Sequence, residues 1–282
     1  MEKSQKIKGS THVEAGRWPL FRGLAEIAEY RDLLGVLAYR DYRVRYAQTY
    51  LGFAWAFIQP LAMLVVFVLV FAKAAGVDTS PIPYPLFAMA GMAAWNYFAF
   101  VMGQSGNSII SAQGMIQKVY FPRLIIPLSK AIVGLVDFAI SFLLILVLMV
   151  WYEYPPSPML WALPFFLLMT LVAALGTGIW MSALTIRYRD LQHVVPFIVQ
   201  FGLFLTPAAY PAGLVISKLP VWGVVLYYLN PMAGVVEGFR WSLLGGPPPV
   251  VYAWISFMMM VVILVMGLIW FRKMERTMAD IV

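Results

Sequence analysis

The sequence contains no cysteine and only two histidines, His12 and His193. Disulfide bonds, thiolate metal sites and cysteine nucleophiles are therefore excluded, and little imidazole remains for metal binding or acid–base chemistry. Charged residues are also scarce: they make up 12% of the chain, whereas hydrophobic residues make up 62%. A soluble domain is about a quarter charged. So few charges cannot cover a soluble protein of this size, and we expect lipid to surround most of the chain.

A phosphate-binding loop is also missing. No Gly-x-x-x-x-Gly-Lys-[Ser/Thr] motif occurs, and the chain has no Gly-Lys dipeptide. Without the backbone amides of that loop the chain has no P-loop ATP site, so any ATP hydrolysis must take place in a separate polypeptide. We expect no catalytic residue, metal or cofactor in this chain.

The chain also lacks the residues that two other functional classes require. A membrane-embedded glycan or lipid enzyme needs paired carboxylates or histidines, but the 13 acidic residues are scattered. A proton-coupled carrier would show internal repeats and several charges within its spans, and neither is evident.

Long apolar runs predict an all-α integral membrane protein with about six transmembrane helices. About 20 apolar residues are needed to cross the hydrocarbon core as a helix. The predicted spans are residues 53–72, 86–107, 129–150, 160–184, 193–211 and 250–270. We divide the chain into a polar N-terminal segment (1–29), an amphipathic interface helix (30–50), a transmembrane domain (51–272) and a tail (273–282).

Basic residues indicate the orientation of these spans. All but three of the 20 Lys and Arg residues fall on the side that holds both termini, and the exceptions are Lys73, Lys218 and Arg240. Because basic residues collect on the cytoplasmic side of membrane proteins, we predict that both termini are cytoplasmic. Membrane lipid, not nucleic acid, is the expected partner of these bases.

The segment before the first span predicts an amphipathic helix. Its apolar stripe consists of Tyr30, Leu33, Leu34, Leu37 and Val44, and its polar face of Glu29, Asp32, Arg40 and Arg43. Asp41 interrupts the apolar stripe, and we expect it to pair with Arg45 one turn later. The helix either lies only at the lipid headgroups or also contacts a cytoplasmic partner protein.

Residues 212–248 are apolar but are interrupted by Pro220 and Pro231. The resulting runs are too short to cross the bilayer, so we predict two short re-entrant helices on the external side before the last span, hinged at Asn230-Pro231. Re-entrant backbone needs protein or a water-filled cavity around it, which points to a pathway. Glu237 and Arg240 could pair, or Lys218 and Arg240 could attract an anionic headgroup or an acidic sugar.

Asp137 lies inside the third predicted span, where a charge is costly. We favour a structural hydrogen bond to a neighbouring helix. The alternative, a proton relay, would need ionisable partners, and only His193 lies near a span.

Five groups of motifs follow one another along the chain. They are Arg40-Asp41-Tyr42-Arg43-Val44-Arg45-Tyr46 with Leu51-Gly52-Phe53-Ala54-Trp55, Lys118-Val119-Tyr120-Phe121-Pro122-Arg123, Arg187-Tyr188-Arg189-Asp190-Leu191, Leu229-Asn230-Pro231-Met232, and Phe271-Arg272 through Ala279-Asp280. In this order they resemble the channel subunits of ABC exporters that move polysaccharides such as O-antigen, capsule and teichoic acid (type-2 ABC transporter permeases). The resemblance covers about residues 30–282.

The resemblance implies contact with an ATPase through a coupling helix in the loop 114–128 and through the interface helix. The implied coupling residues are Lys118, Tyr120, Phe121, Pro122, Arg123, Arg40, Asp41, Arg43 and Arg45. The alternative is an ordinary basic loop that joins two spans. The resemblance also implies an external gate formed by Tyr210, Lys218, Asn230, Pro231, Glu237 and Arg240.

Aromatic residues recur on one face of the first and fifth spans. They are Phe53, Phe57, Phe67 and Phe71 in the first, and Phe197, Phe201 and Phe204 in the fifth. Sugar rings stack on aromatic side chains, and the resemblance implies that these two spans line the channel, which makes Phe53, Phe57, Phe67, Phe197, Phe201 and Phe204 candidate lining residues. The alternative is packing or contact with lipid.

Together these features predict the channel-forming subunit of an ATP-driven polysaccharide exporter, with a lipid-linked glycan as substrate. The resemblance implies a homodimer of this chain on two P-loop ATPase subunits, which bind ATP and Mg²⁺, in the bacterial cytoplasmic (inner) membrane. The same architecture could instead export a lipid or a drug.

Overall fold

The computed structural model describes residues 27–46 and 52–281, and within these ranges the chain is helical without strands. Five helical segments are long and apolar enough to cross a membrane: Gly52–Ala74, Tyr84–Ser111, Ile125–Trp151, Leu160–Arg187 and Ala253–Glu275. The prediction of an all-α, multi-pass membrane protein is confirmed. The segment 1–26 and residues 47–51 lie outside the described residues.

The elements follow one another in a simple order. They are α2 (Arg31–Tyr46), α3 (Trp55–Phe67) with a 3₁₀ turn before it (Gly52–Ala54) and a π-helical segment after it (Val68–Ala74), α4 (Tyr84–Ser111), α5 (Gln113–Ile116), α6 (Ile125–Trp151), a 3₁₀ turn (Leu160–Ala162), α7 (Leu163–Arg187), α8 (Leu191–Leu205), α9 (Ala212–Ile216), α10 (Val221–Tyr228), α11 (Pro231–Leu244) and α12 (Ala253–Ile281).

The fifth predicted span, 193–211, differs most from the structure. Helix α8 ends at Leu205, because Thr206 adopts an extended conformation before Pro207. Its 15 residues rise only about 22 Å, which is less than the hydrocarbon thickness of about 30 Å. This crossing is therefore not one continuous helix, and the predicted end at residue 211 is wrong.

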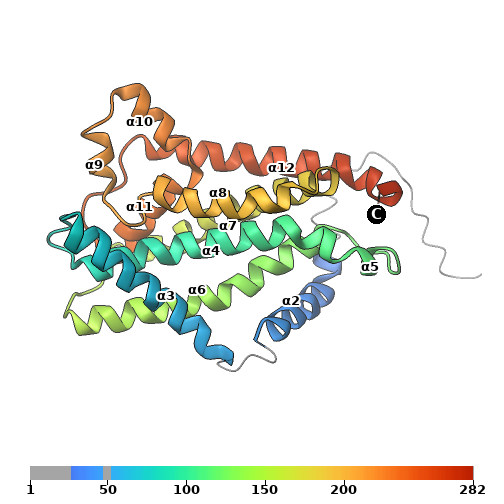
Figure 1. The fold of residues 1–282 in the computed structure, drawn as a ribbon, viewed down its shortest axis with the longest axis horizontal. Coiled ribbons are helices and arrows are strands. Elements are labelled where there is room, and N and C mark those ends of the chain that lie inside the picture. The colour runs from blue at the N-terminus through green and yellow to red at the C-terminus, as the bar shows by residue number, and fades with distance from the viewer. Residues whose placement is uncertain (1–26, 47–51, 282) are drawn as a thin grey trace, which may run out of the picture.

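Helix α4 is the centre of the bundle. It packs against α7, α6, α11, α8 and α3, and α7 in turn packs along α12. Figure 1 shows α5 and the C-terminal end of α12 at one end of the bundle and α9 and α10 at the opposite end. The main hydrophobic core surrounds α4 and includes fully buried Leu86, Tyr97 and Phe239.

Small residues permit the closest helix contacts. A Cβ at Gly178 of α7 would lie 2.7 Å from the Ser105 Cβ of α4, and a Cβ at Gly176 would lie 2.9 Å from the Leu264 backbone of α12. Gly103 of α4 differs from these two glycines, because no atom lies within 4 Å of a Cβ built on it. That residue faces open space.

The interface helix α2 packs against α6. Leu37 and Ala38 are buried. Tyr30 and Leu33 contact a second, small hydrophobic core, which includes Phe121 and Phe271 and lies at the end of the bundle that holds α5. Val44, which we placed on the same apolar stripe, is exposed. The apolar face therefore covers only the first two-thirds of the helix.

The segment before the last span contains three helices, α9, α10 and α11, where we predicted two. The predicted junction at Asn230-Pro231 is correct, since α10 ends at Tyr228 and α11 begins at Pro231. Helix α11 packs against α12, α4 and α7, so it enters the bundle.

Candidate functional site

The loop between α4 and α6 has an exposed tip on a buried base. After α5, Val119 and Tyr120 project into solvent, and Tyr120 is 71% exposed. Phe121, only 5% exposed, lies in the small core with Phe271 and Met274 of α12. Of the coupling residues predicted here, Lys118 and Tyr120 are on the outside, and Phe121 is an internal anchor.

Arg123 connects the same loop to α12 by a hydrogen bond. Its Nη1 atom donates a hydrogen bond of 2.8 Å to the carbonyl oxygen of Glu275 in α12, and Pro122 beside it is half-buried. Through Arg123 and Phe121 the loop is joined directly to α12. A force on Tyr120 would therefore reach both α4 and α12.

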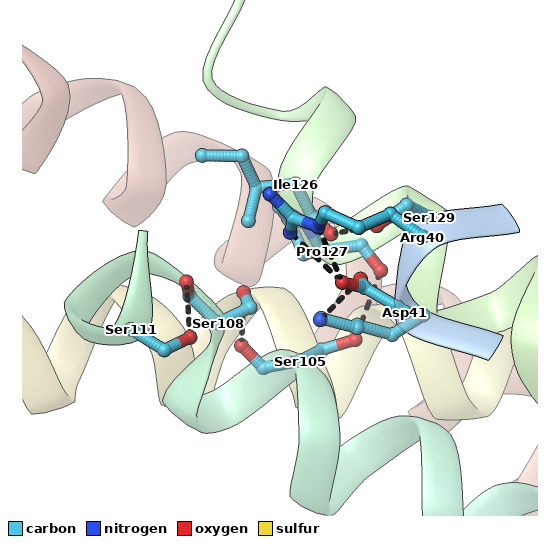
Figure 2. Close-up of polar contacts among 9 residues, drawn as sticks. Arg40, Asp41, Ser105, Ser108, Ser111, Ile126, Pro127 and Ser129 are labelled. Atoms are coloured by element: carbon cyan, nitrogen blue, oxygen red, sulfur yellow. Dashed lines mark hydrogen bonds and ion pairs between the residues drawn. The ribbon is translucent and has the colours of Figure 1, made fainter. Parts of the chain in front are cut away.

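A charge cluster joins α2 to α6. Asp41 accepts hydrogen bonds from Arg40 at 2.8 Å and from the Lys130 ammonium of α6 at 2.5 Å, and Figure 2 shows the Arg40 guanidinium directed at the Asp41 carboxylate. Burial raises the pKa of Asp41, but the hydrogen bonds from Lys130 and Arg40 outweigh burial and hold the pKa below its ordinary value. Asp41 therefore remains ionised at neutral pH.

A second ion pair lies farther along the same two helices. Arg45 pairs with Asp137, and its guanidinium lies 4.5 Å from the centre of the Phe100 ring. The predicted pair of Asp41 with Arg45 is therefore wrong, since each residue pairs with α6. Asp137 makes the expected contact with another helix, and its partner is the cation of Arg45.

Arg43 points away from this cluster. It is exposed, with its guanidinium 5.8 Å from the centre of the Tyr39 ring on the same helix. Among the predicted coupling residues of α2, Asp41 and Arg45 hold the helix in place, whereas Arg43 remains on the exposed surface.

A row of serines lies beside the charge cluster at the same end of the bundle (Figure 2). Ser105 donates to the Pro127 carbonyl of α6 at 3.0 Å, whereas Ser108 and Ser111 donate to carbonyls one turn earlier in α4. We did not predict a role for these serines. Their three-residue spacing places them on one face of a helix, and this pattern could have been read from the sequence.

The aromatic stripes differ in exposure. Phe197, Phe201 and Phe204 lie on the outer surface of α8, with Phe201 66% exposed. On α3, Phe53 is exposed and Phe57 half-buried, with their rings 5.7 Å apart. Phe67 is 1% exposed and packs on Phe71, so it belongs to the core.

Arg240 of α11 is buried, only 6% exposed. Its Nη2 donates to the carbonyls of Pro207 at 2.8 Å and Ala208 at 3.1 Å, its Nε donates to the carbonyl of Phe87 at 3.3 Å, and its guanidinium lies 3.5 Å from the Phe87 ring centre. Arg240 therefore joins α11 to α4 and to the segment after α8. It cannot attract an anion from solvent as we had considered.

Glu237 does not form the ion pair with Arg240 that we considered as one alternative. Its Oε1 instead accepts a hydrogen bond of 2.6 Å from the hydroxyl of Tyr228, the last residue of α10. This bond ties α10 to α11. The i to i+3 spacing that suggested an ion pair does not bring the two side chains together, because Arg240 turns toward α4.

The junction of α10 and α11 is held by hydrogen bonds that we did not predict. The Asn230 side chain caps α11 by accepting from the Met232 N–H and donates to Thr206 Oγ1 at 2.8 Å. Ser256 of α12 has Oγ within 2.9 Å of both the Tyr228 and the Asn230 carbonyl oxygens and accepts from the Gly234 N–H. Asn230-Pro231 is thus a fixed corner of the structure.

The other two predicted gate residues lie nearer the surface. The Tyr210 hydroxyl donates to the Phe204 carbonyl at 2.9 Å, and Lys218 is exposed in the turn after α9. Among the predicted gate residues, Lys218 is therefore an exposed surface residue, whereas Asn230, Glu237 and Arg240 each bind a neighbouring element.

Comparison with known proteins gives consistent matches. The sequence model of the ABC-2 type transporter family matches residues 32–244. An O-antigen export system permease protein RfbA from Klebsiella pneumoniae is 28% identical over 252 residues, 89% of this chain and 95% of that protein. A protein of the same name from Myxococcus xanthus is 29% identical over 222 residues, 78% and 84% of the two chains. A polysialic acid transport protein KpsM from Escherichia coli is 22% identical over 208 residues, 73% and 79% of the two chains.

Proposed function

Because this chain belongs to the ABC-2 type transporter family, we propose that it is the channel-forming membrane subunit of an ATP-driven exporter of polysaccharide. The observation that carries the proposal is the full-length similarity to permease proteins of O-antigen export, which extends over 89% of this chain and 95% of one relative. A lipid-linked glycan is the proposed substrate. The chain is a transport subunit and not an enzyme.

The proposed partner is a separate P-loop ATPase subunit. That subunit, and not this chain, would bind ATP and Mg²⁺. Two surfaces at one end of the bundle support this partnership: the exposed tip at Tyr120 and the basic face of α2 at Arg43. Both are attached to spanning helices, the loop to α12 through Arg123 and α2 to α6 through Asp41 and Arg45. Movements of the ATPase would therefore reach the spans directly.

A second copy of the chain completes the proposed channel. The exposed rings of Phe197, Phe201 and Phe204 and the poorly covered face of α3 around Phe53 are surfaces that a homodimer could enclose. Phe67 is excluded from this lining because it is buried within a single chain. The bacterial cytoplasmic membrane, with both termini cytoplasmic, is the proposed location.

Deletion of the gene from its host tests this function. The surface polysaccharide should disappear, its lipid-linked precursor should accumulate inside the cell, and expression of the chain should restore export. Purification of the tagged chain should also recover an ATPase subunit. Unchanged surface polysaccharide after deletion would refute the proposal, and accumulation of a different lipid or a drug would redirect it to that substrate.

A further inference from the structure

The spanning helices fall into two groups by the polar residues on their surfaces. In α6, α7 and α12, the uncharged Ser and Thr side chains within the spans are buried or half-buried, and no Asn or Gln occurs there. In α3, α4 and α8, amide side chains are exposed. These exposed amides are Gln59 of α3, Asn96 and Gln104 of α4, and Gln200 of α8.

None of these four amides has a hydrogen-bond partner within the described residues. An amide that faces hydrocarbon without a partner costs several kcal/mol, so polar residues within spans face protein or a water-filled cavity. The outer faces of α6 and α12 are apolar, with Val147 and Val261 among the exposed residues, and they suit lipid. The faces of α3, α4 and α8 that carry the amides are not suited to contact with lipid.

The three helices that carry amides are neighbours. Both α3 and α8 pack against α4, and Figure 1 shows them on either side of it. The contact between α4 and α8 is close, because a Cβ at Gly202 would lie 2.6 Å from the Trp95 ring. The exposed amides therefore lie on three neighbouring helices of the bundle.

On α8 the amide is part of the aromatic stripe. Gln200 is three residues after Phe197, one before Phe201 and four before Phe204, so at helical spacing all four share one face. An amide both donates and accepts hydrogen bonds, and an aromatic ring offers a flat apolar surface. Hydroxyl-rich sugar rings present the matching groups on their edges and faces.

We propose that Gln59, Asn96, Gln104 and Gln200 line the translocation path and hydrogen-bond the hydroxyl groups of the passing glycan. This inference rests on the proposed function and names the contacts through which the substrate is held. Between Gly52 and Phe71, and throughout α4 and α8, the described residues contain no Lys, Arg, Asp or Glu. The path therefore holds the glycan through neutral contacts. A moving polymer can exchange such contacts from one residue to the next.

The absence of native cysteine allows a direct test. Single substitutions Gln59→Cys, Asn96→Cys and Gln200→Cys in the full chain, expressed in its host with its own ATPase, are treated with a membrane-impermeant thiol reagent. Val147→Cys and Val261→Cys are the matched controls, since both positions are exposed but apolar. The amide positions should react, and the two valine positions should not.

Two other results would overturn the inference. Amide positions as unreactive as the valine controls would face lipid. Disulfide cross-links between two copies at these positions, without reagent labelling, would mean that the amides pack against the second copy and not against a glycan.

Export provides a second readout. Gln200→Leu keeps the size of the side chain and suits lipid, so a position that faces lipid should tolerate it. The inference predicts about a fivefold slower export, the effect of one lost hydrogen bond, with unchanged protein abundance and ATPase association. Export at the wild-type rate would contradict it.

The wild-type chain in the same cells tests the proposed function separately. If the wild type restores no surface glycan, the proposed function fails whatever the labelling shows. If it restores glycan while the amide positions do not react, only the present inference fails.

Discussion

Gly91 and Arg240 show how single residues hold α4, α11 and the segment after α8 together. Arg240 can reach the carbonyls of Pro207 and Ala208 only because α4 has no side chain at residue 91. A Cβ there would lie 2.4 Å from the Ala208 oxygen and 2.5 Å from Arg240 Nη2. The glycine is required by the space that the guanidinium and a neighbouring backbone occupy.

We expect Gly91→Ala to destabilise the protein by about 1–3 kcal/mol, the usual result of forcing an extra carbon into a packed site. Thermal unfolding of the purified chain in detergent would measure the loss. Gly103→Ala is the matched control, since it lies on the same helix with open space around it. Equal stability of the two variants would mean that the Arg240 site can rearrange freely.

Asp41 leads to a prediction about pH. Its pKa lies below the ordinary value because Lys130 and Arg40 donate to it, so the contact stabilises the folded chain above the ordinary pKa of about 4. This stability is lost only as the pH falls through the lowered pKa. The stability difference between wild type and Asp41→Asn should be the same at pH 8 and pH 5 and should shrink in stronger acid. A marked decrease between pH 8 and pH 5 would disprove the assignment.

At the scale of elements, α2 is held by contacts at both ends of its packed face. Leu37 lies against the bundle, and the ion pairs Asp41–Lys130 and Arg45–Asp137 follow along α6. Asp137→Asn should weaken this attachment, which hydrogen exchange of the α2 amides would report as faster exchange. Asp32→Asn, which alters an exposed carboxylate on the same helix, should leave the exchange unchanged.

The loop after α5 has an exposed and a buried aromatic residue side by side, Tyr120 and Phe121. Tyr120→Ala should reduce recovery of the ATPase with the purified chain, because Tyr120 lies at the exposed tip of the loop. Phe121→Ala should lower stability by about 3 kcal/mol, as for other buried phenylalanines. If Tyr120→Ala recovers the ATPase as the wild type does, this tip is not the contact.

At the scale of the whole molecule, the sequence predicted the spans well and the contacts between them poorly. Spans follow from local hydropathy, because a helix in lipid must be apolar over its own length. Contacts depend on residues far apart in the chain: Arg45 and Asp137 are separated by 92 positions, and Arg240 and Phe87 by 153. The pair of Asp41 with Arg45 that we predicted from helical spacing is wrong for this reason, and Glu237 and Arg240, which the same spacing allowed to pair, bind other elements.

The distribution of bases also makes a prediction about the whole chain. Lys118 and Lys218 lie in segments at opposite ends of the bundle. In spheroplasts, an impermeant thiol reagent should label Lys218→Cys at once and Lys118→Cys only after the membrane is opened. The reverse pattern would invert the proposed orientation.

Helix α12 contacts elements at both ends of the bundle. Its 29 residues extend about 43 Å. In its first turn Ser256 binds the corner between α10 and α11, and about two turns before its end the Glu275 carbonyl accepts a hydrogen bond from Arg123. A helix fixed at both of these points would carry a displacement from one end of the bundle to the other, so under the proposed function a push on the loop at Tyr120 and a shift of the corner between α10 and α11 would be parts of a single movement.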